Sequence, residues 1–234
     1  WILDHPEADP DKPDKVGYHR FASGLHELLG LAWNDGALYT MQRSELTRVT
    51  DTDGDGVADL YECVSKGWGV SGNYHEYAYG PVVDKQGDFW ISLNVSLGNP
   101  VKMPGYRETE RPWRGWGMKI GKDGALEPMC AGFRSPSGIG SNAEGDVFVT
   151  DQQGNWWGTN PLLHLRKGAF FGHGDTVVDT KRPESPVKDP GKLPQEITVV
   201  EASQKIPGFA LPAVWFPYVK MGQSPTGFAC DQTA

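Results

Sequence analysis

The sequence has few cysteines, no long apolar run and no excess of basic residues. Its three cysteines, Cys63, Cys130 and Cys230, lie far apart, so that neither a CxxC nor a CxxCH motif occurs. This excludes a c-type haem attachment site and a cysteine-based zinc site within the chain. One disulfide is possible, but the sequence alone does not show which two of the three cysteines would form it.

The absence of long apolar and basic stretches limits the class of protein further. No segment reaches the ~18 apolar residues of a membrane-spanning helix, so we expect no membrane span. Lys and Arg number 22 against 30 Asp and Glu, and the net charge of −8 argues against a nucleic-acid partner. No signal peptide is visible, and the chain begins at Trp1 without an initiator Met. We therefore expect a processed or truncated chain whose targeting segment is missing.

The sequence is instead rich in turn residues and aromatics, with 30 Gly, 18 Pro and 9 Trp. This composition favours many short strands joined by tight turns. Similar segments recur at 30–41, 77–93 and 137–151, each with a strand, a glycine turn and an aromatic or β-branched strand. A further predicted hairpin, 117–129, would supply outer strands. The turn glycines Gly36, Gly87 and Gly145 are roughly 50 to 60 residues apart, which is close to the period of propeller blades with inserted loops.

We therefore predict an all-β fold, a β-propeller, with a β-sandwich of similar hairpins as the alternative. A fourth repeat begins at 226–231, so that the chain would cover roughly four blades of one partial propeller domain over 1–234. We expect an irregular N-terminal segment at 1–23. Two long loop insertions are expected at 99–115 and 175–209, the second with a short helix at 194–204.

The segment 51–62, DTDGDGVADLYE, matches the pattern of a calcium-binding loop. Calcium prefers six to eight oxygen ligands around a sharply turning backbone, and Gly56 stands where that backbone needs a positive φ. The predicted ligands are five carboxylates and one backbone carbonyl: Asp51, Asp53, Asp55, Val57, Asp59 and Glu62. The alternative is a solvated acidic turn. The strand-like residues 46–50 before the loop distinguish it from an EF-hand, and they indicate a structural ion between two blades.

His75 stands just before the second repeat strand, a position that lies near the central channel of a propeller. A neutral imidazole there can accept a proton, as a general base for alcohol oxidation must. The alternative is a hydrogen-bonded structural histidine. Arg134 precedes the third repeat strand, where it can bind a carboxylate or form an ion pair between blades.

These stretches together resemble the glucose/sorbosone dehydrogenase superfamily of six-bladed quinoprotein propellers. The resemblance is closest to the propellers of planctomycete-type bacteria that are often fused to a haem-binding domain. It rests on four segments in the family's order: DTDGDGVADLYE, GNYHEYAYGPVVDKQGDFWISL, GFRSPSGIGSNAEGDVFVTDQQGNW and HLRKGAFFGH. They run from about residue 24 to 173, with a weaker match at 212–231.

The resemblance implies a pyrroloquinoline quinone (PQQ) site at the top of the propeller. His75 matches the histidine that takes the substrate proton as hydride moves to the quinone. Arg134 and Gln152 match quinone contacts. The chain departs from the family at Tyr74, where the sugar dehydrogenases have Asp, and at Ser135, where they have Asn.

The function expected from this resemblance is a periplasmic or secreted, calcium-containing dehydrogenase. It would oxidise a sugar or polyol with PQQ and pass electrons to a cytochrome c-type partner. The alternative is a non-catalytic propeller that binds glycans or a partner domain through Trp113, Trp116, Trp156 and Trp157. A lactonase-type hydrolase is a third hypothesis, for which the sequence offers no set of carboxylates and histidine around a channel metal.

Overall fold

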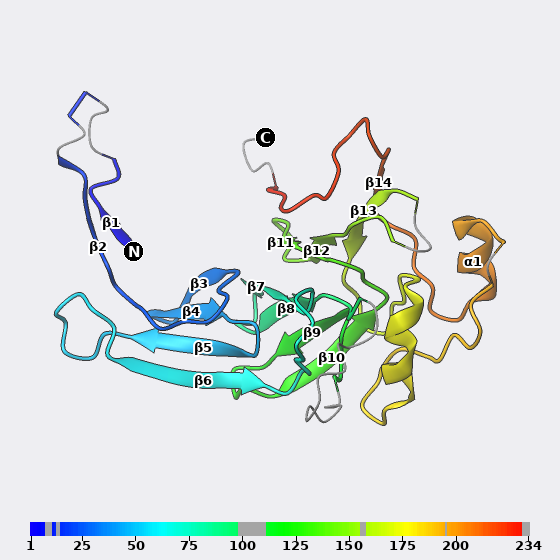
Figure 1. The fold of residues 1–234 in the computed structure, drawn as a ribbon, viewed down its shortest axis with the longest axis horizontal. Helices are drawn as coiled ribbons and strands as arrows, with labels where there is room; N and C mark the ends of the chain where they lie inside the picture. Colours follow the sequence, from blue (N-terminus) through cyan, green and yellow to red (C-terminus); the bar gives the residue numbers. More distant parts are fainter. Residues whose placement is uncertain (8–10, 13–14, 98–110, 155–157, 195, 231–234) are drawn as a thin grey trace.

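A computed structural model gives the fold of the chain (Figure 1). It describes residues 1–230 except for 8–10, 13–14, 98–110, 155–157 and 195. Three four-stranded antiparallel sheets follow one another along the chain, and a two-stranded sheet precedes them. Among the described residues, no helix is both long and apolar enough to cross a membrane.

The first blade begins with the first predicted hairpin. Its strands are β3 (Leu31–Asn34), β4 (Ala37–Met41), β5 (Glu45–Thr50) and β6 (Leu60–Lys66), paired in that order. Asp35 and Gly36 have φ of 47° and 73° in the turn between β3 and β4. Two consecutive positive φ values suit the twist of a two-residue hairpin.

The second and third blades repeat this order of strands. The second consists of β7 (Ala78–Val83), β8 (Phe89–Leu93), β9 (Trp116–Ile120) and β10 (Leu126–Ala131). The predicted 117–129 hairpin is thus confirmed as the outer pair of this blade. The third consists of β11 (Gly138–Ser141), β12 (Val147–Thr150), β13 (Asn160–His164) and β14 (Val214–Phe216).

The three blades pack side by side through their innermost strands. Strand β7 contacts β3 of the first blade and β11 of the third. All five residues of β8 are buried. Phe89, Ile91 and Leu93 belong to the apolar cluster shared with the first blade, and Trp90 belongs to the cluster shared with the third. Sheets packed face to face around their first strands form a β-propeller, which confirms the predicted all-β fold class.

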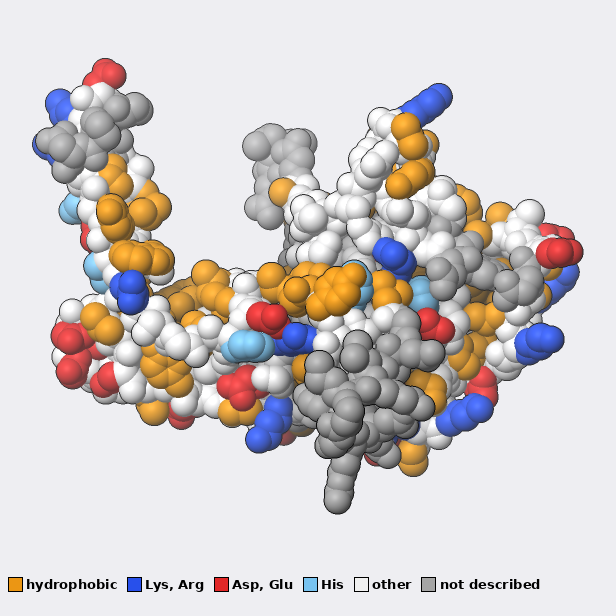
Figure 2. All heavy atoms as spheres, in the orientation of Figure 1, with side chains coloured by type: hydrophobic (Ala, Val, Ile, Leu, Met, Phe, Trp, Pro, Cys, Tyr) orange, Lys and Arg blue, Asp and Glu red, His pale blue; other side chains and the backbone are white. Residues whose placement is uncertain are grey.

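The two ends of the chain differ in part from the expected pattern. The N-terminal segment, expected to be irregular, forms a projecting hairpin of β1 (Ile2–Asp4) and β2 (Gly17–His19) (Figures 1 and 2). Hydrophobic side chains are exposed along it. Among the described residues of the fourth repeat, 226–230 form no strand, but this segment packs against β11, where Gly227 approaches Gly138.

The two predicted loop insertions are more structured than expected. Residues 99–110 of the first lie outside the described part, whereas Trp113 and Arg114 at its end are buried. The second contains a 3₁₀ helix, η2 (Gly174–Lys181), and a helix α1 (Val199–Lys205), which begins five residues later than predicted. Thr198 and Glu201 cap α1 reciprocally, so the start of the helix follows this capping box.

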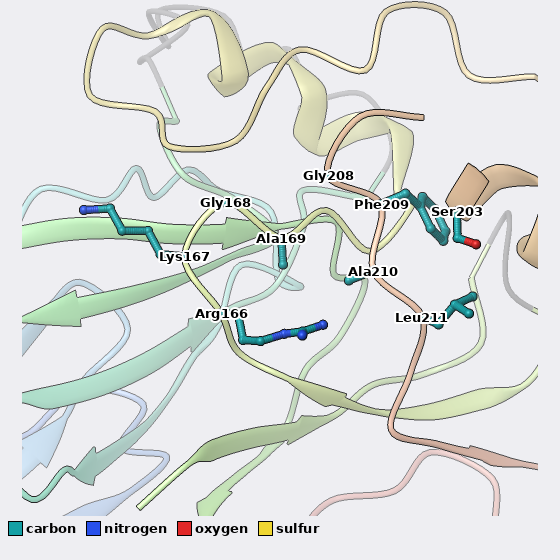
Figure 3. Close-up of a pocket in the computed structure, with 9 residues that line it drawn as sticks. All are labelled: Arg166, Lys167, Gly168, Ala169, Ser203, Gly208, Phe209, Ala210 and Leu211. Atoms are coloured by element: carbon teal, nitrogen blue, oxygen red, sulfur yellow. The ribbon is translucent and has the colours of Figure 1, made fainter. Parts of the chain in front are cut away.

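The chain after β13 extends the sheet of the second blade. Phe170 bridges Ala131 and Phe209 in parallel, and a groove of about 560 Å³ lies beside this extension. In Figure 3 the Arg166 side chain extends toward the segment of Ala210 and Leu211. None of the predicted site residues lines this groove.

Candidate functional site

The candidate catalytic and quinone-contacting residues gather at one edge of the blades. In each antiparallel inner hairpin, the start of the first strand and the end of the second lie at the same edge. His75 precedes β7, Arg134 precedes β11 and Gln152 follows β12. Backbone bonds join these loops, because Asn94 N donates to Tyr77 O at 3.1 Å and Val95 N to Arg134 O at 3.0 Å.

Asp151 is the residue that organises this edge in the third blade. Its side chain is buried, with 3% of the residue exposed. Oδ2 accepts from the Arg134 backbone N–H at 2.8 Å, and Oδ1 accepts from those of Ser135 at 2.6 Å and Gln152 at 2.8 Å. Burial raises the pKa of Asp151 to about 6, although these three donors act to lower it. One carboxylate therefore fixes the loops of both predicted quinone contacts.

The structure brings the side chains of Arg134 and Gln152, the two predicted quinone contacts, together. Arg134 Nη1 donates to Gln152 Oε1 at 2.5 Å, and the Gln152 amide donates to Ser224 Oγ. Among the described residues the Arg134 guanidinium forms no salt bridge, so a carboxylate on a ligand is a fitting partner.

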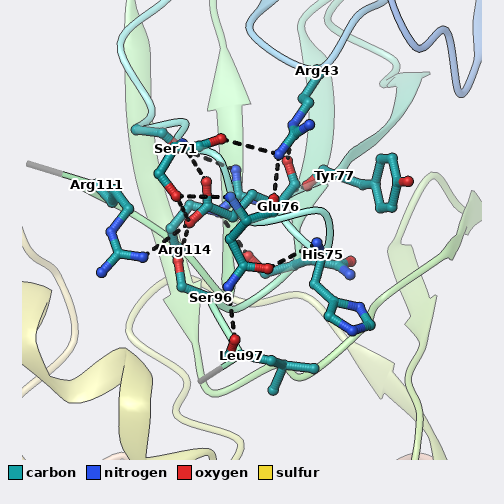
Figure 4. A network of polar contacts seen from close by, with 12 residues as sticks. Arg43, Ser71, His75, Glu76, Tyr77, Ser96, Leu97, Arg111 and Arg114 are labelled. Carbon is teal, nitrogen blue, oxygen red and sulfur yellow. Dashed lines mark hydrogen bonds and ion pairs between the residues drawn. The ribbon is translucent and has the colours of Figure 1, made fainter. Parts of the chain in front are cut away.

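His75 lies on the loop before β7 and is half-buried. Its backbone N–H donates to Asn73 Oδ1 at 3.0 Å, and its ring lies against the Tyr74 ring, tilted by 38° with 3.9 Å between centroids. Figure 4 shows the imidazole directed away from the polar network behind it. The described contacts do not join the His75 ring to Arg134, so that His75 remains a candidate by position.

The network behind His75 centres on Glu76, which is fully buried. Glu76 Oε1 accepts from Ser96 Oγ at 2.6 Å, Ser71 Oγ at 2.9 Å and Arg111 Nη1 at 3.2 Å (Figure 4). Burial raises the pKa of Glu76, but the bonds from Ser96 and Ser71 outweigh it and lower the pKa below its ordinary value. This carboxylate holds the loop that carries His75.

Two arginines complete the support of this loop from other segments. Arg43 donates to the carbonyl oxygens of Glu76 at 3.2 Å and of Asn73. The buried Arg114 donates to the carbonyl oxygens of Asn94 at 2.8 Å and Tyr77 at 2.6 Å. Burial lowers the pKa of Arg114 to about 10. Sequence reasoning missed Arg43, Arg114 and Glu76, because all the partners of the two arginines named here, and Ser96 and Arg111 beside Glu76, lie 20 or more residues away along the chain.

Several buried polar atoms at this edge have no hydrogen-bond partner among the described residues. They belong to four side chains beside the Arg134 loop or the end of β12 and the start of β13: Asn94 Oδ1, Gln153 Oε1, Thr159 Oγ1 and both ring nitrogens of His173. Buried polar groups are normally paired, so this set fits a ligand that supplies several donors and acceptors. PQQ is such a group, and the residues present therefore fit it.

The predicted calcium loop places three of its carboxylates together. Ligand oxygens of Asp51, Asp53 and Asp55 lie within 4.8 Å of one another. Asp51 Oδ1 accepts from Gly54 N at 2.7 Å and Oδ2 from Gly56 N at 2.9 Å, and these bonds lower the pKa of Asp51. Gly56 has a φ of 89°, as the sharp turn requires.

The remaining predicted ligands are engaged with protein groups. Asp59 accepts from the hydroxyl and the backbone of Thr52 at 2.6 and 2.9 Å, and both bonds lower the pKa of Asp59. Glu62 lies on β6 opposite Arg48 and pairs with it at 3.1 Å. Val57 N donates to Asp55 Oδ1 at 2.8 Å. The described cluster is thus a three-carboxylate centre, and Asp59, Glu62 and the Val57 carbonyl stay predicted ligands.

The prediction that four tryptophans form a glycan-binding surface is wrong for Trp113 and Trp116. Trp113 and Trp116 are buried in the apolar cluster between the blades, where they contact each other edge to face. Trp116 lies on β9, which is almost entirely buried, and the Trp113 backbone N–H donates to Asp179 Oδ2 on η2 at 2.8 Å, so that both residues are held in the core. Trp156 and Trp157 lie outside the described residues.

No protein-family model and no curated protein matches the chain, whereas several solved structures share its fold. A glucose dehydrogenase has a TM-score of 0.54 and 15% identity over 84% of this chain and 60% of its own. The PQQ-bound aldose sugar dehydrogenase of Streptomyces coelicolor has a TM-score of 0.53 and 14% identity over 88% of this chain and 58% of its own. An oxidoreductase of Thermus thermophilus, described as a glucose dehydrogenase, has a TM-score of 0.50 and 16% identity over 86% of this chain and 58% of its own.

The present chain has the fold of the sugar dehydrogenase β-propellers. The expected resemblance to the glucose/sorbosone dehydrogenase-like propellers is thereby confirmed at the level of fold. This propeller chain spans about 60% of the length of the glucose dehydrogenase and 58% of the other two structures.

Proposed function

We propose that this chain is a calcium-containing quinoprotein dehydrogenase that oxidises a sugar or polyol hydroxyl. The observation that carries the proposal is the buried Asp151, which fixes Arg134 and Gln152 together at the edge that also carries His75. Within the described part of the chain, the Arg134 guanidinium has no salt bridge and several buried polar atoms at the same edge are unpaired, which suits a carboxylate-bearing quinone. The sugar dehydrogenase fold supports the same class of reaction.

In this proposal each residue has a separate task. Arg134 and Gln152 bind and orient the quinone, which supplies a two-electron acceptor when bound. His75 takes the proton of the substrate hydroxyl, which its position outside the Glu76 network allows. Glu76, Arg43 and Arg114 hold the loop on which His75 stands. A cytochrome c-type partner would accept the electrons from the reduced quinone. The predicted calcium loop suits a periplasmic or secreted protein.

The direct test replaces His75 by Ala and measures dye-linked oxidation of aldoses and polyols after reconstitution with PQQ and Ca²⁺. General-base catalysis contributes roughly 10²- to 10⁴-fold, so we expect kcat to fall by about that factor. Quinone binding and calcium binding should be retained. His26→Ala is the matched control, because His26 is exposed and precedes the first repeat strand as His75 precedes the second. Unchanged turnover in the His75→Ala variant contradicts the assignment.

Tyr74 favours the alternative of a non-catalytic propeller that binds glycans. Tyr74 is 70% exposed beside His75, and an exposed aromatic side chain can stack on a sugar ring. The two functions separate in a titration with PQQ. Binding of the quinone supports the dehydrogenase, whereas glycan binding that is lost in Tyr74→Ala, with no quinone binding, supports the alternative.

A further inference from the structure

His173 lies at the end of the segment that extends the second blade, and its backbone is fixed. Its N–H donates to Gly132 O at 3.2 Å, and its carbonyl oxygen accepts from Thr176 Oγ1 at 2.7 Å. Only 3% of the residue is exposed. The sequence HLRKGAFFGH contributes to the family resemblance, but no role follows from it for this histidine. The fold places its ring beside the Arg134 loop.

The side chains of Arg134 and His173 both approach Gly154. A Cβ atom at Gly154 would lie 3.3 Å from Arg134 Cδ and 3.4 Å from His173 Cδ2. The charged groups that act on the imidazole are Arg134 and Asp175. Glycine at position 154 therefore lets an arginine and a histidine from different segments approach the same point.

The His173 ring is buried without a hydrogen bond. Neither Nδ1 nor Nε2 has a partner within the described part of the chain. Burial lowers the pKa of His173, so the ring is neutral near pH 7 and offers one donor and one acceptor. Leaving such a group unpaired is unfavourable, and a ligand can offset this by supplying the missing partners.

We propose that His173 is a further binding residue, which hydrogen-bonds to a carboxylate-bearing ligand held by Arg134. The nitrogen that carries the proton donates to an oxygen of this ligand, and the other accepts from a donor on the ligand or its water. This inference rests on the proposed function where the ligand is the quinone. His173 positions the ligand and does not act as the base.

The experiment compares His173→Phe, His173→Gln and wild type in the absence and presence of PQQ. Phe keeps the planar shape and removes both unpaired nitrogens, so we expect an unchanged or higher Tm without ligand. The Kd for PQQ, from absorbance titration, should rise about 10- to 100-fold. Gln keeps a donor and an acceptor and should restore part of the affinity. His164→Phe on β13, away from this edge, should leave Kd unchanged.

The result that overturns the inference is a lower Tm of ligand-free His173→Phe with an unchanged Kd, since this describes a structural histidine. If wild type does not bind PQQ, the proposed function fails, and citrate then tests His173 alone. Citrate at millimolar concentration should raise the Tm of wild type but not of His173→Phe or Arg134→Ala. No Tm shift in wild type with citrate, and no PQQ binding, rejects both proposals.

Discussion

At the scale of single residues, Asp151 shows how one carboxylate assembles a site from two strands. Its oxygens accept three backbone N–H groups, two of them from residues 134 and 135 on another loop. Asp151→Asn replaces one acceptor oxygen by an N–H₂ group that faces a donor. We expect a loss of about 1–3 kcal/mol in unfolding free energy, measured by urea denaturation with an unchanged m-value. Asp146→Asn, in an exposed turn, is the control and should change stability little.

The same residue predicts a dependence of stability on pH. Its folded pKa of about 6 lies above the ordinary value of 3.8, so the native state binds this proton more tightly than the unfolded state. The stabilisation is complete below pH 3.8 and is lost as the pH rises to about 6. The stability difference between wild type and Asp151→Asn should thus be larger at about pH 4 than at about pH 7. A difference that grows with pH contradicts this assignment.

The sequence predicted some site residues and missed others for a physical reason. Arg134 and Gln152 could be found because they occur in ordered motifs. Asp151, which stands beside Gln152, could not be found in this way, because two of its three donors lie 16 and 17 residues away along the chain. Glu76 stood beside His75 and gave no signal, because only the tertiary fold brings Ser96 and Arg111 to it.

At the scale of elements, the 51–62 loop predicts how calcium acts on the stretch between β5 and β6. Three carboxylates already face one another there and repel without a cation. Ca²⁺ should raise Tm and slow proteolysis between residues 51 and 75, and chelation should reverse both. Asp53→Asn keeps the side-chain shape and removes one charge, so we expect about a tenfold or greater loss in calcium affinity by isothermal titration calorimetry.

Glu144→Gln is the matched control for the calcium loop, because Glu144 is an exposed acid in another glycine turn. The affinity of the Glu144→Gln variant for calcium should equal that of the wild type. Equal affinity in Asp53→Asn, or no binding by wild type, would show that the cluster is a solvated acidic turn.

The elements themselves were largely predictable. A strand, a glycine turn and an aromatic or β-branched strand around each of Gly36, Gly87 and Gly145 predicted the three inner hairpins, since turn chemistry and strand composition are both local. The 3₁₀ helix η2 and the parallel bridge at Phe170 were not predicted. They depend on contacts with Gly132, Ala131 and Phe209 from other parts of the chain.

At the scale of the molecule, the blades differ in how completely their faces are covered. Strand β8 of the middle blade is buried throughout, because a blade packs on each side of it. On β3 of the first blade, Leu31 is 58% and Trp33 is 70% exposed. These alternate residues share one face of the strand, and β14 also exposes Val214 and Trp215. The repeat period predicted the blades, but it could not show which faces of them are covered.

An exposed pair of large apolar residues on a sheet face predicts self-association of the 234-residue chain. Sedimentation velocity should show a concentration-dependent oligomer for the wild type. Leu31→Thr combined with Trp33→Thr keeps strand propensity and removes the apolar face, so that the monomer should predominate with an unchanged circular dichroism spectrum. Val178→Thr is the control, because Val178 is about as exposed as Trp33, at 69%, but lies on the 3₁₀ helix η2 and not on a strand. It should associate as the wild type does. A wild-type chain that stays monomeric at all concentrations would contradict the prediction, since Leu31 and Trp33 then remain in water at no cost to solubility.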